Sequence, residues 1–124
     1  KGKNRQMRQG LIYKHALLHH QEECPDLHLA VRMAAIAEDE LGKLNEADLK
    51  VEVNGSVCLG DCIQGITGAR LANPARFTYS LSNDYGETVW RKGNRVLKIT
   101  AKKAFAVQDL KDMADEYLFS IISY

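Results

Sequence analysis

The sequence has few cysteines, few aromatic residues and no long apolar run. Its three cysteines are an odd number, which argues against a disulfide framework and favours free thiols or metal ligands in a reducing compartment. No apolar run approaches the roughly 20 residues that a membrane span needs, and the start of the chain has no signal-peptide pattern. We therefore expect a cytoplasmic protein with no membrane partner. Because the chain does not begin with Met, export followed by removal of a signal stays open as the alternative.

The chain also lacks an excess of charge of either sign. Seventeen Lys and Arg against sixteen Asp and Glu give a net charge of +1, so bulk charge does not draw it to nucleic acid or anionic lipid. The basic stretch 91–103 has little aromatic interleaving, and we predict no nucleic-acid site there. With 45% apolar and 27% charged residues, the composition is that of one globular domain covering residues 1–124.

Two helices are predicted in the first third of the chain. A rough helical spacing of apolar residues indicates the first over about Asn4–His19. Cys24 occupies an N-cap position and Pro25 suits the first turn of the second helix. Its helical pattern runs to Gly42, a typical C-terminal stop. The short segment between His19 and Cys24 therefore joins two helices.

A strand and a short helix are predicted next. Leu49–Val53 alternates apolar and polar residues, as a half-buried strand does. Ser56 is a natural N-cap, and apolar residues at helical spacing continue from it to Gly68. Gly60 and Gly65 would weaken so short a helix in isolation, so we expect close packing or a ligand beside it.

The last part of the chain contains three alternating segments and a long apolar stripe. The alternating segments are Phe77–Leu81, Thr88–Trp90 and Val96–Thr100, and the turn sequences between them predict an antiparallel meander. The stripe runs at helical spacing from Val107 to Ile122 and predicts a helix that packs on the sheet or on a second copy of the chain. The order of elements predicts an α+β fold with a helix-strand-helix-three-strand core, a mixed sheet, and helices at both ends.

All three cysteines lie near predicted helix starts, where backbone N–H groups and the helix dipole favour a thiolate. Cys58 and Cys62 are four residues apart and point to one side of their helix, with Asp61 on much the same side. If this face lies beside Cys24, the imidazole nitrogen of His20 and the sulfurs of the three cysteines form the soft tetrahedral ligand set that zinc or another transition metal prefers. The candidate ligands are His20, Cys24, Cys58 and Cys62.

Other interpretations of these residues stay open. With three ligands bound, Glu22, Asp61 or water would take the remaining position, and the metal could polarise a substrate. Without a metal, Cys24 or Cys58 could act as a thiolate assisted by His20, in a small cysteine-dependent enzyme or redox protein. The simplest alternative is that the cysteines pack as small hydrophobic side chains.

Glu22 and Asp61 could otherwise support the bound ligands or contact a substrate, and two further residues, Arg32 and Tyr85, are candidates for the same roles. Arg32 either forms an ion pair with Asp26 or Glu38 or holds an anionic ligand. Tyr85 stands in an Asp-Tyr-Gly turn and either lines a pocket or covers the core. For both residues the structural role is the default interpretation.

These residues resemble the signature of the FmdE-like family, which is named for its association with formylmethanofuran dehydrogenase. That signature contains a His-Gly-His-x-Cys-Pro-Gly segment, a helix with Arg-x-Ala, and a second Cys followed by Asp and Ile-Gln. The matching positions, which span about residues 18–100, are His20, Cys24, Pro25, Val31–Ala34, Cys58, Asp61, Ile63, Gln64, Thr67, Gly68 and Asp84–Gly86. The chain departs from the family at Glu22, Asp26 and Cys62, where His, Gly and a small apolar residue are usual. Residues 1–124 include no cysteine-rich zinc ribbon of the kind that many longer members carry.

The resemblance implies a helix, strand, helix, three-strand core, an intertwined homodimer, and a metal such as zinc near the family's His and Cys. It predicts a metal-binding accessory or small-ligand domain that could belong to a larger enzyme complex. The alternatives are the cysteine-dependent enzyme and a purely structural dimerisation module whose final helix mediates assembly.

Overall fold

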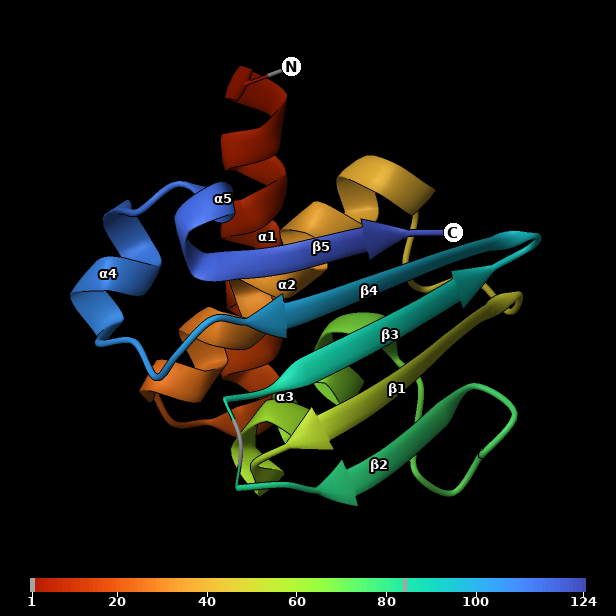
Figure 1. The fold of residues 1–124 in the computed structure, drawn as a ribbon. Helices are drawn as coiled ribbons and strands as arrows, with labels where there is room; N and C mark the ends of the chain where they lie inside the picture. Colours follow the sequence, from red (N-terminus) through yellow and green to blue (C-terminus); the bar gives the residue numbers. More distant parts are fainter. Residues whose placement is uncertain (1, 84) are drawn as a thin grey trace.

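A five-stranded mixed sheet with helices packed on one of its faces makes up the structure (Figure 1). The computed structural model describes residues 2–83 and 85–124. Its elements in chain order are α1 (Gly2–His20), α2 (Pro25–Leu41), β1 (Leu49–Gly55), α3 (Val57–Thr67), β2 (Phe77–Leu81), β3 (Glu87–Lys92), β4 (Arg95–Ala101), α4 (Val107–Asp112), α5 (Asp115–Leu118) and β5 (Phe119–Ser123). The predicted α+β fold is therefore confirmed.

The helices stack on the sheet in two layers. α2 and α3 contact the strands, and α1 packs across α2 and α3 on the side away from the sheet (Figure 1). Residues 27–37 of α2 are buried on every side of the helix, because the sheet lies on one side of it and α1 on the other. The core centres on Trp90 and the inward-facing residues of β1 (Leu49, Val51 and Val53).

The ends of α2 and α3 follow local sequence signals. Cys24 is the N-cap of α2 with an extended backbone, Pro25 follows at the first position, and Gly42 ends the helix with a φ of 82°. Ser56 caps α3 by accepting a hydrogen bond from the Leu59 backbone N–H at 3.0 Å. Gly68 then ends α3 in the left-handed region. Each of these predicted boundaries is confirmed.

The predicted antiparallel meander is wrong at its first strand. β2 does not pair with β3; it lies at the edge of the sheet and pairs in parallel with β1, in the order β2-β1-β3-β4-β5. Parallel neighbours need a crossover connection, and α3 provides it between β1 and β2. Only β3 and β4 form the predicted hairpin, closed at Gly93 with a φ of 60°.

The single C-terminal helix predicted from Val107 to Ile122 is also wrong. α4 ends where Met113 turns to an extended backbone, the short α5 follows, and β5 then pairs antiparallel with β4, with Ile121 opposite Ile99. The Ser-Ile-Ile-Ser sequence of this segment suits a strand, since β-branched residues favour extended backbone. The open edge of β4 provides backbone hydrogen-bonding partners for this segment. A helix prediction from local spacing does not take such a distant partner into account.

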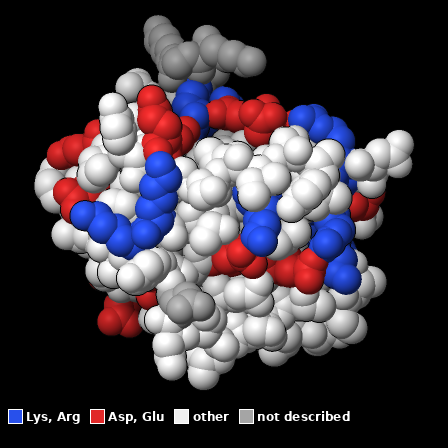
Figure 2. Space-filling model, viewed as in Figure 1, with Lys and Arg blue, Asp and Glu red and all other residues white. Residues whose placement is uncertain are grey.

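The sheet face opposite the helices carries charged side chains of both signs (Figure 2). Ion pairs join Glu52 to Arg91 and, at 3.5 Å, Glu87 to Lys98 across neighbouring strands. Exposed pairs of this kind contribute little to stability, so they mainly keep this face hydrated. Among the described residues, no helix has both the length and the apolar character that crossing a membrane demands.

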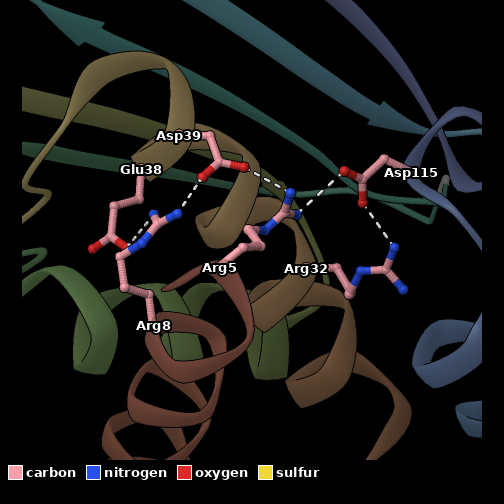
Figure 3. A network of polar contacts seen from close by, with 6 residues as sticks. All are labelled: Arg5, Arg8, Arg32, Glu38, Asp39 and Asp115. Carbon is pink, nitrogen blue, oxygen red and sulfur yellow. Dashed lines mark hydrogen bonds and ion pairs between the residues drawn. The ribbon is translucent and has the colours of Figure 1, made fainter. Parts of the chain in front are cut away.

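A network of ion pairs connects α1 with α2 and with the start of α5 (Figure 3). Its members are Arg5, Arg8, Arg32, Glu38, Asp39 and Asp115. Within it, Arg32 pairs with Asp115 at 2.7 Å and donates to the Leu110 carbonyl at 2.7 Å. The predicted pairing of Arg32 with Asp26 or Glu38 is wrong, because α4 and α5 fold back against α2 and bring Asp115 closer.

Candidate metal centre

Three side chains from three helices converge at one point. His20 is the last residue of α1, Cys24 caps α2, and Cys58 lies in the first turn of α3. One potential ligand atom of each lies within 4.8 Å of the others, and all three side chains are half-buried. The structure thus brings together three of the four predicted ligands, from segments far apart in the sequence.

The turn between α1 and α2 places His20 beside Cys24. Gln21 adopts a φ of 63°, and its backbone N–H donates to the Leu17 carbonyl at 2.7 Å, which ends α1 abruptly. His20 Nε2 then lies 3.7 Å from Cys24 Sγ. The Cys24 side chain makes no capping hydrogen bond, and its sulfur contacts His20 instead of the backbone of α2.

Asp61 orients the histidine from the opposite side. Its two carboxylate oxygens lie 2.7 Å from His20 Nδ1 and 3.0 Å from His19 Nε2. An ionised carboxylate only accepts hydrogen bonds, so Nδ1 of His20 donates to Asp61, and in the neutral imidazole the lone pair is on Nε2. That lone pair lies on the side of Cys24. A carboxylate behind the imidazole is the usual support of a histidine that binds a metal.

Close helix packing brings Asp61 to the histidines. A Cβ added at Gly65 would lie 2.5 Å from His19 Cβ, so only glycine lets α3 approach α1 this closely. A Cβ at Gly60 would lie 2.8 Å from the Tyr79 ring of β2. The close packing predicted from these two glycines is present at both.

The starts of α2 and α3 are also joined directly. Ser56 Oγ donates to Asp26 Oδ2 at 2.7 Å while it caps its own helix. This bond fixes the position of the α3 start, which carries Cys58, relative to the α2 start, which carries Cys24. Asp26, one of the departures from the family signature, therefore has a structural partner.

The thiols differ in how easily they lose a proton. Burial raises the pKa of Cys58 above its ordinary value, and the neighbouring Cys24 adds to the rise. Burial raises the pKa of Cys62 much further, with Cys24 and Asp61 contributing. A thiolate at either position is disfavoured in the metal-free protein, whereas a bound cation would favour it. All three cysteines are free.

The remaining predicted site residues have different positions. Cys62 is fully buried and does not belong to the group of three atoms; its role as a ligand stays a prediction. Glu22 is exposed in the turn before α2, and its charge contributes to the raised pKa of Cys58. Arg32 contacts Leu110 and Asp115 in the ion-pair network.

Tyr85 lines a cavity of about 540 Å³ beside the candidate centre. Its walls include Pro25 and Ser56, which flank the starts of α2 and α3. Tyr85 itself is 55% exposed, so it covers little of the core. Asp84 of the same predicted turn lies outside the described residues.

Sequence reasoning did not place His19 at this site, where it shares Asp61 with His20. Nothing in the local sequence indicates that contact, because it depends on how α1 crosses α3. The unusual glycine content of α3 was the available signal, since it predicted close packing without naming the neighbour.

A comparison with known protein families finds a match that covers most of the chain. The sequence model of the family described as FmdE, Molybdenum formylmethanofuran dehydrogenase operon, matches residues 19–119. The matched segment contains His20, Cys24 and Cys58. No curated protein matches the chain.

Proposed function

Because the chain belongs to the FmdE family, we propose that it is a metal-binding accessory protein. In this proposal His20, Cys24 and Cys58 hold a transition metal, and zinc is the best-suited ion. The observation that carries the proposal is the convergence of their donor atoms within 4.8 Å. One imidazole nitrogen and two thiolate sulfurs are a donor set that zinc favours.

The surroundings of the three donors support a metal over a free thiol. Asp61 fixes the His20 tautomer that binds a cation. The raised pKa of Cys58 argues against a free thiolate nucleophile there, as the alternative cysteine-dependent enzyme would need. A bound ion would displace the thiol protons and act as a Lewis acid in its open position.

Two versions of the site differ in Cys62. In the open version three residues bind the metal, and water or a small ligand takes the fourth position. In the closed version Cys62 is the fourth ligand and the site is structural. The geometry favours the open version, because the Cys62 sulfur does not belong to the group of donor atoms that lie within 4.8 Å of one another.

The open version also agrees with a role in ligand binding. The cavity lined by Tyr85 has a volume of about 540 Å³, which is within the usual range for small-molecule sites. It borders the helix starts that carry Cys24 and Cys58. We propose that the protein acts as an accessory to a larger enzyme. The description of the family supports this, because it names the operon of an enzyme, formylmethanofuran dehydrogenase.

Metal content tests the proposal directly. Protein purified without added metal should contain about one zinc per chain, measured by elemental analysis. Removing the ion with a chelator should lower the melting temperature, because a ligand that binds only the folded state stabilises it. Protein that contains no stoichiometric transition metal, either as purified or after reconstitution with zinc or cobalt, would refute the proposal.

We also propose that the chain forms a homodimer through the β5 edge of the sheet. β5 pairs with β4 on one side only in the described chain, and it contains no charged residue. Ile121 and Ile122 on this strand are 41% and 44% exposed, and Tyr124 beyond it is 71% exposed. An uncharged, partly apolar edge strand is open to pairing with another chain.

Sedimentation equilibrium should give twice the mass of the chain for the parent protein. Ile122→Lys should shift the distribution toward the monomer, since it places a charge on the proposed interface. A monomer mass that does not change with protein concentration would eliminate the dimer.

A further inference from the structure

A second cavity lies between α1, α2 and α4, and none of the three candidate metal ligands lines it. Its volume is about 480 Å³, within the range of small-molecule sites. Val31 and Leu110 contribute apolar wall, while Tyr13, Glu23, Arg32 and Lys111 contribute polar groups. We propose that this cavity binds a small carboxylic acid with an apolar body. The proposal is independent of the metal.

Gly10 leaves the α1 wall of the cavity open. It lies inside α1, where glycine costs about 1 kcal/mol relative to alanine. No backbone requirement explains it, because its φ is not positive, and a Cβ added there would meet nothing within 4 Å. The missing side chain instead leaves space that a ligand can fill.

Beside Gly10, two stacked aromatic rings from α1 and α2 line the cavity. The Tyr13 and His28 rings stack with centroids 5.5 Å apart and an interplanar angle of 24°. His28 is 6% exposed, and its Nε2 lies 2.8 Å from the Glu23 carboxylate. The same carboxylate interacts with the Tyr13 hydroxyl, so its charge is already engaged. This wall suits the apolar body of a ligand better than its charged end.

Arg32 supplies a donor for the charged end. The residue is 7% exposed, and its Nη atoms are satisfied by Asp115 and the Leu110 carbonyl. Its Nε is buried without a hydrogen-bond partner. Arg32 lines the cavity, and because a buried guanidinium N–H without an acceptor is costly, we expect a bound carboxylate to draw Nε toward it as that acceptor.

Lys111 supplies the second positive group. It is exposed, lines the same cavity as Arg32, and follows Leu110 on α4. A monocarboxylate can accept from Arg32 Nε and approach the Lys111 ammonium while its body lies along Tyr13. A dianion such as phosphate has no apolar part to cover this wall, and its second negative charge would add to the repulsion by Glu23 that a monocarboxylate meets with one charge.

Binding to the whole chain can be tested with three probes: phenylacetate, its neutral amide phenylacetamide, and inorganic phosphate. The shifts of the backbone N–H signals in NMR spectra report the binding of each probe. Phenylacetate should saturate the site with a Kd of about 1 mM, a value reasonable for so small a ligand. The amide should bind at least about fivefold more weakly, because it loses the charge-assisted hydrogen bond. Equal binding of acid and amide, no saturable binding of either, or binding of phosphate alone would overturn the proposal.

Two variants locate the binding. Gly10→Leu should fill the cavity and raise the Kd for phenylacetate about tenfold or more, whereas Met7→Leu puts the same side chain on an exposed part of α1 and should change nothing. Lys111→Met should raise the Kd about threefold to tenfold without disturbing the fold. Parent-like affinity in Gly10→Leu or in Lys111→Met would overturn the proposal. Zinc content should stay unchanged in all three variants, so a failure here is distinct from a failure of the metal centre.

Discussion

Replacing Cys58 by Ser should weaken zinc binding more than a hundredfold. The substitution removes one of three protein donors, and the loss of a mere supporting residue already costs about 10- to 100-fold in metal affinity. A serine hydroxyl is a poor substitute, because zinc prefers thiolate sulfur to a neutral oxygen. Cys24→Ser should give the same result. Competition with a chromophoric chelator measures the affinity of each variant.

Two neighbouring substitutions serve as graded controls for this result. Asp61→Ala should weaken binding by about 10- to 100-fold, because His20 loses the acceptor that fixes its tautomer. Cys62→Ala should have little effect if the site is open, and an effect as large as that of Cys58→Ser if it is closed. Parent-like zinc affinity in both Cys24→Ser and Cys58→Ser would contradict the proposed centre.

Gly65→Ala should destabilise the protein by about 1–3 kcal/mol, the usual cost of overpacking a tight contact. The added Cβ would lie 2.5 Å from His19 Cβ, so α3 must move away from α1. Zinc affinity should fall too, because this movement separates Asp61 from both histidines. Urea denaturation of the metal-free protein measures the free energy of unfolding without the contribution of bound zinc.

Gly10→Ala is the matched control, since it makes the same change on α1. The new Cβ meets nothing within 4 Å, so alanine should stabilise the protein by about 0.5–1 kcal/mol through its better helix propensity. The test is that the free energy of unfolding falls in Gly65→Ala and rises in Gly10→Ala. Stabilisation by Gly65→Ala would show that α1 and α3 do not pack as closely as described.

Sequence signals were sufficient where the structure is decided locally. The start of α2 depends on Cys24 and Pro25, and that of α3 on Ser56, all within one helical turn of the boundary. The same local signals placed Cys24 and Cys58 at helix starts. Cys24 and Cys58 converge because these helix starts lie side by side, which the residues alone left as a condition.

Sequence signals failed where a distant partner decides the structure. Phe77–Leu81 is a strand in either arrangement, and only packing against α3 makes it a parallel neighbour of β1. Ile121 and Ile122 fit a helical stripe as well as a strand, and the free edge of β4 selects the strand. The contact of Asp61 with His19 likewise depends on a crossing between two helices, which no local pattern records.

The separation of the donors along the chain has a consequence for how the protein is made. All of α2 and β1 lie between Cys24 and Cys58. During synthesis, His20 and Cys24 leave the ribosome well before Cys58, so the nascent chain has no complete ion-binding set until α3 has emerged and docked. Small zinc modules hold their ligands close in sequence and fold around the ion. In the proposed centre the order would be the reverse, because its donors meet only after the helices have packed, so uptake of the ion would mark a chain that has already acquired its tertiary structure.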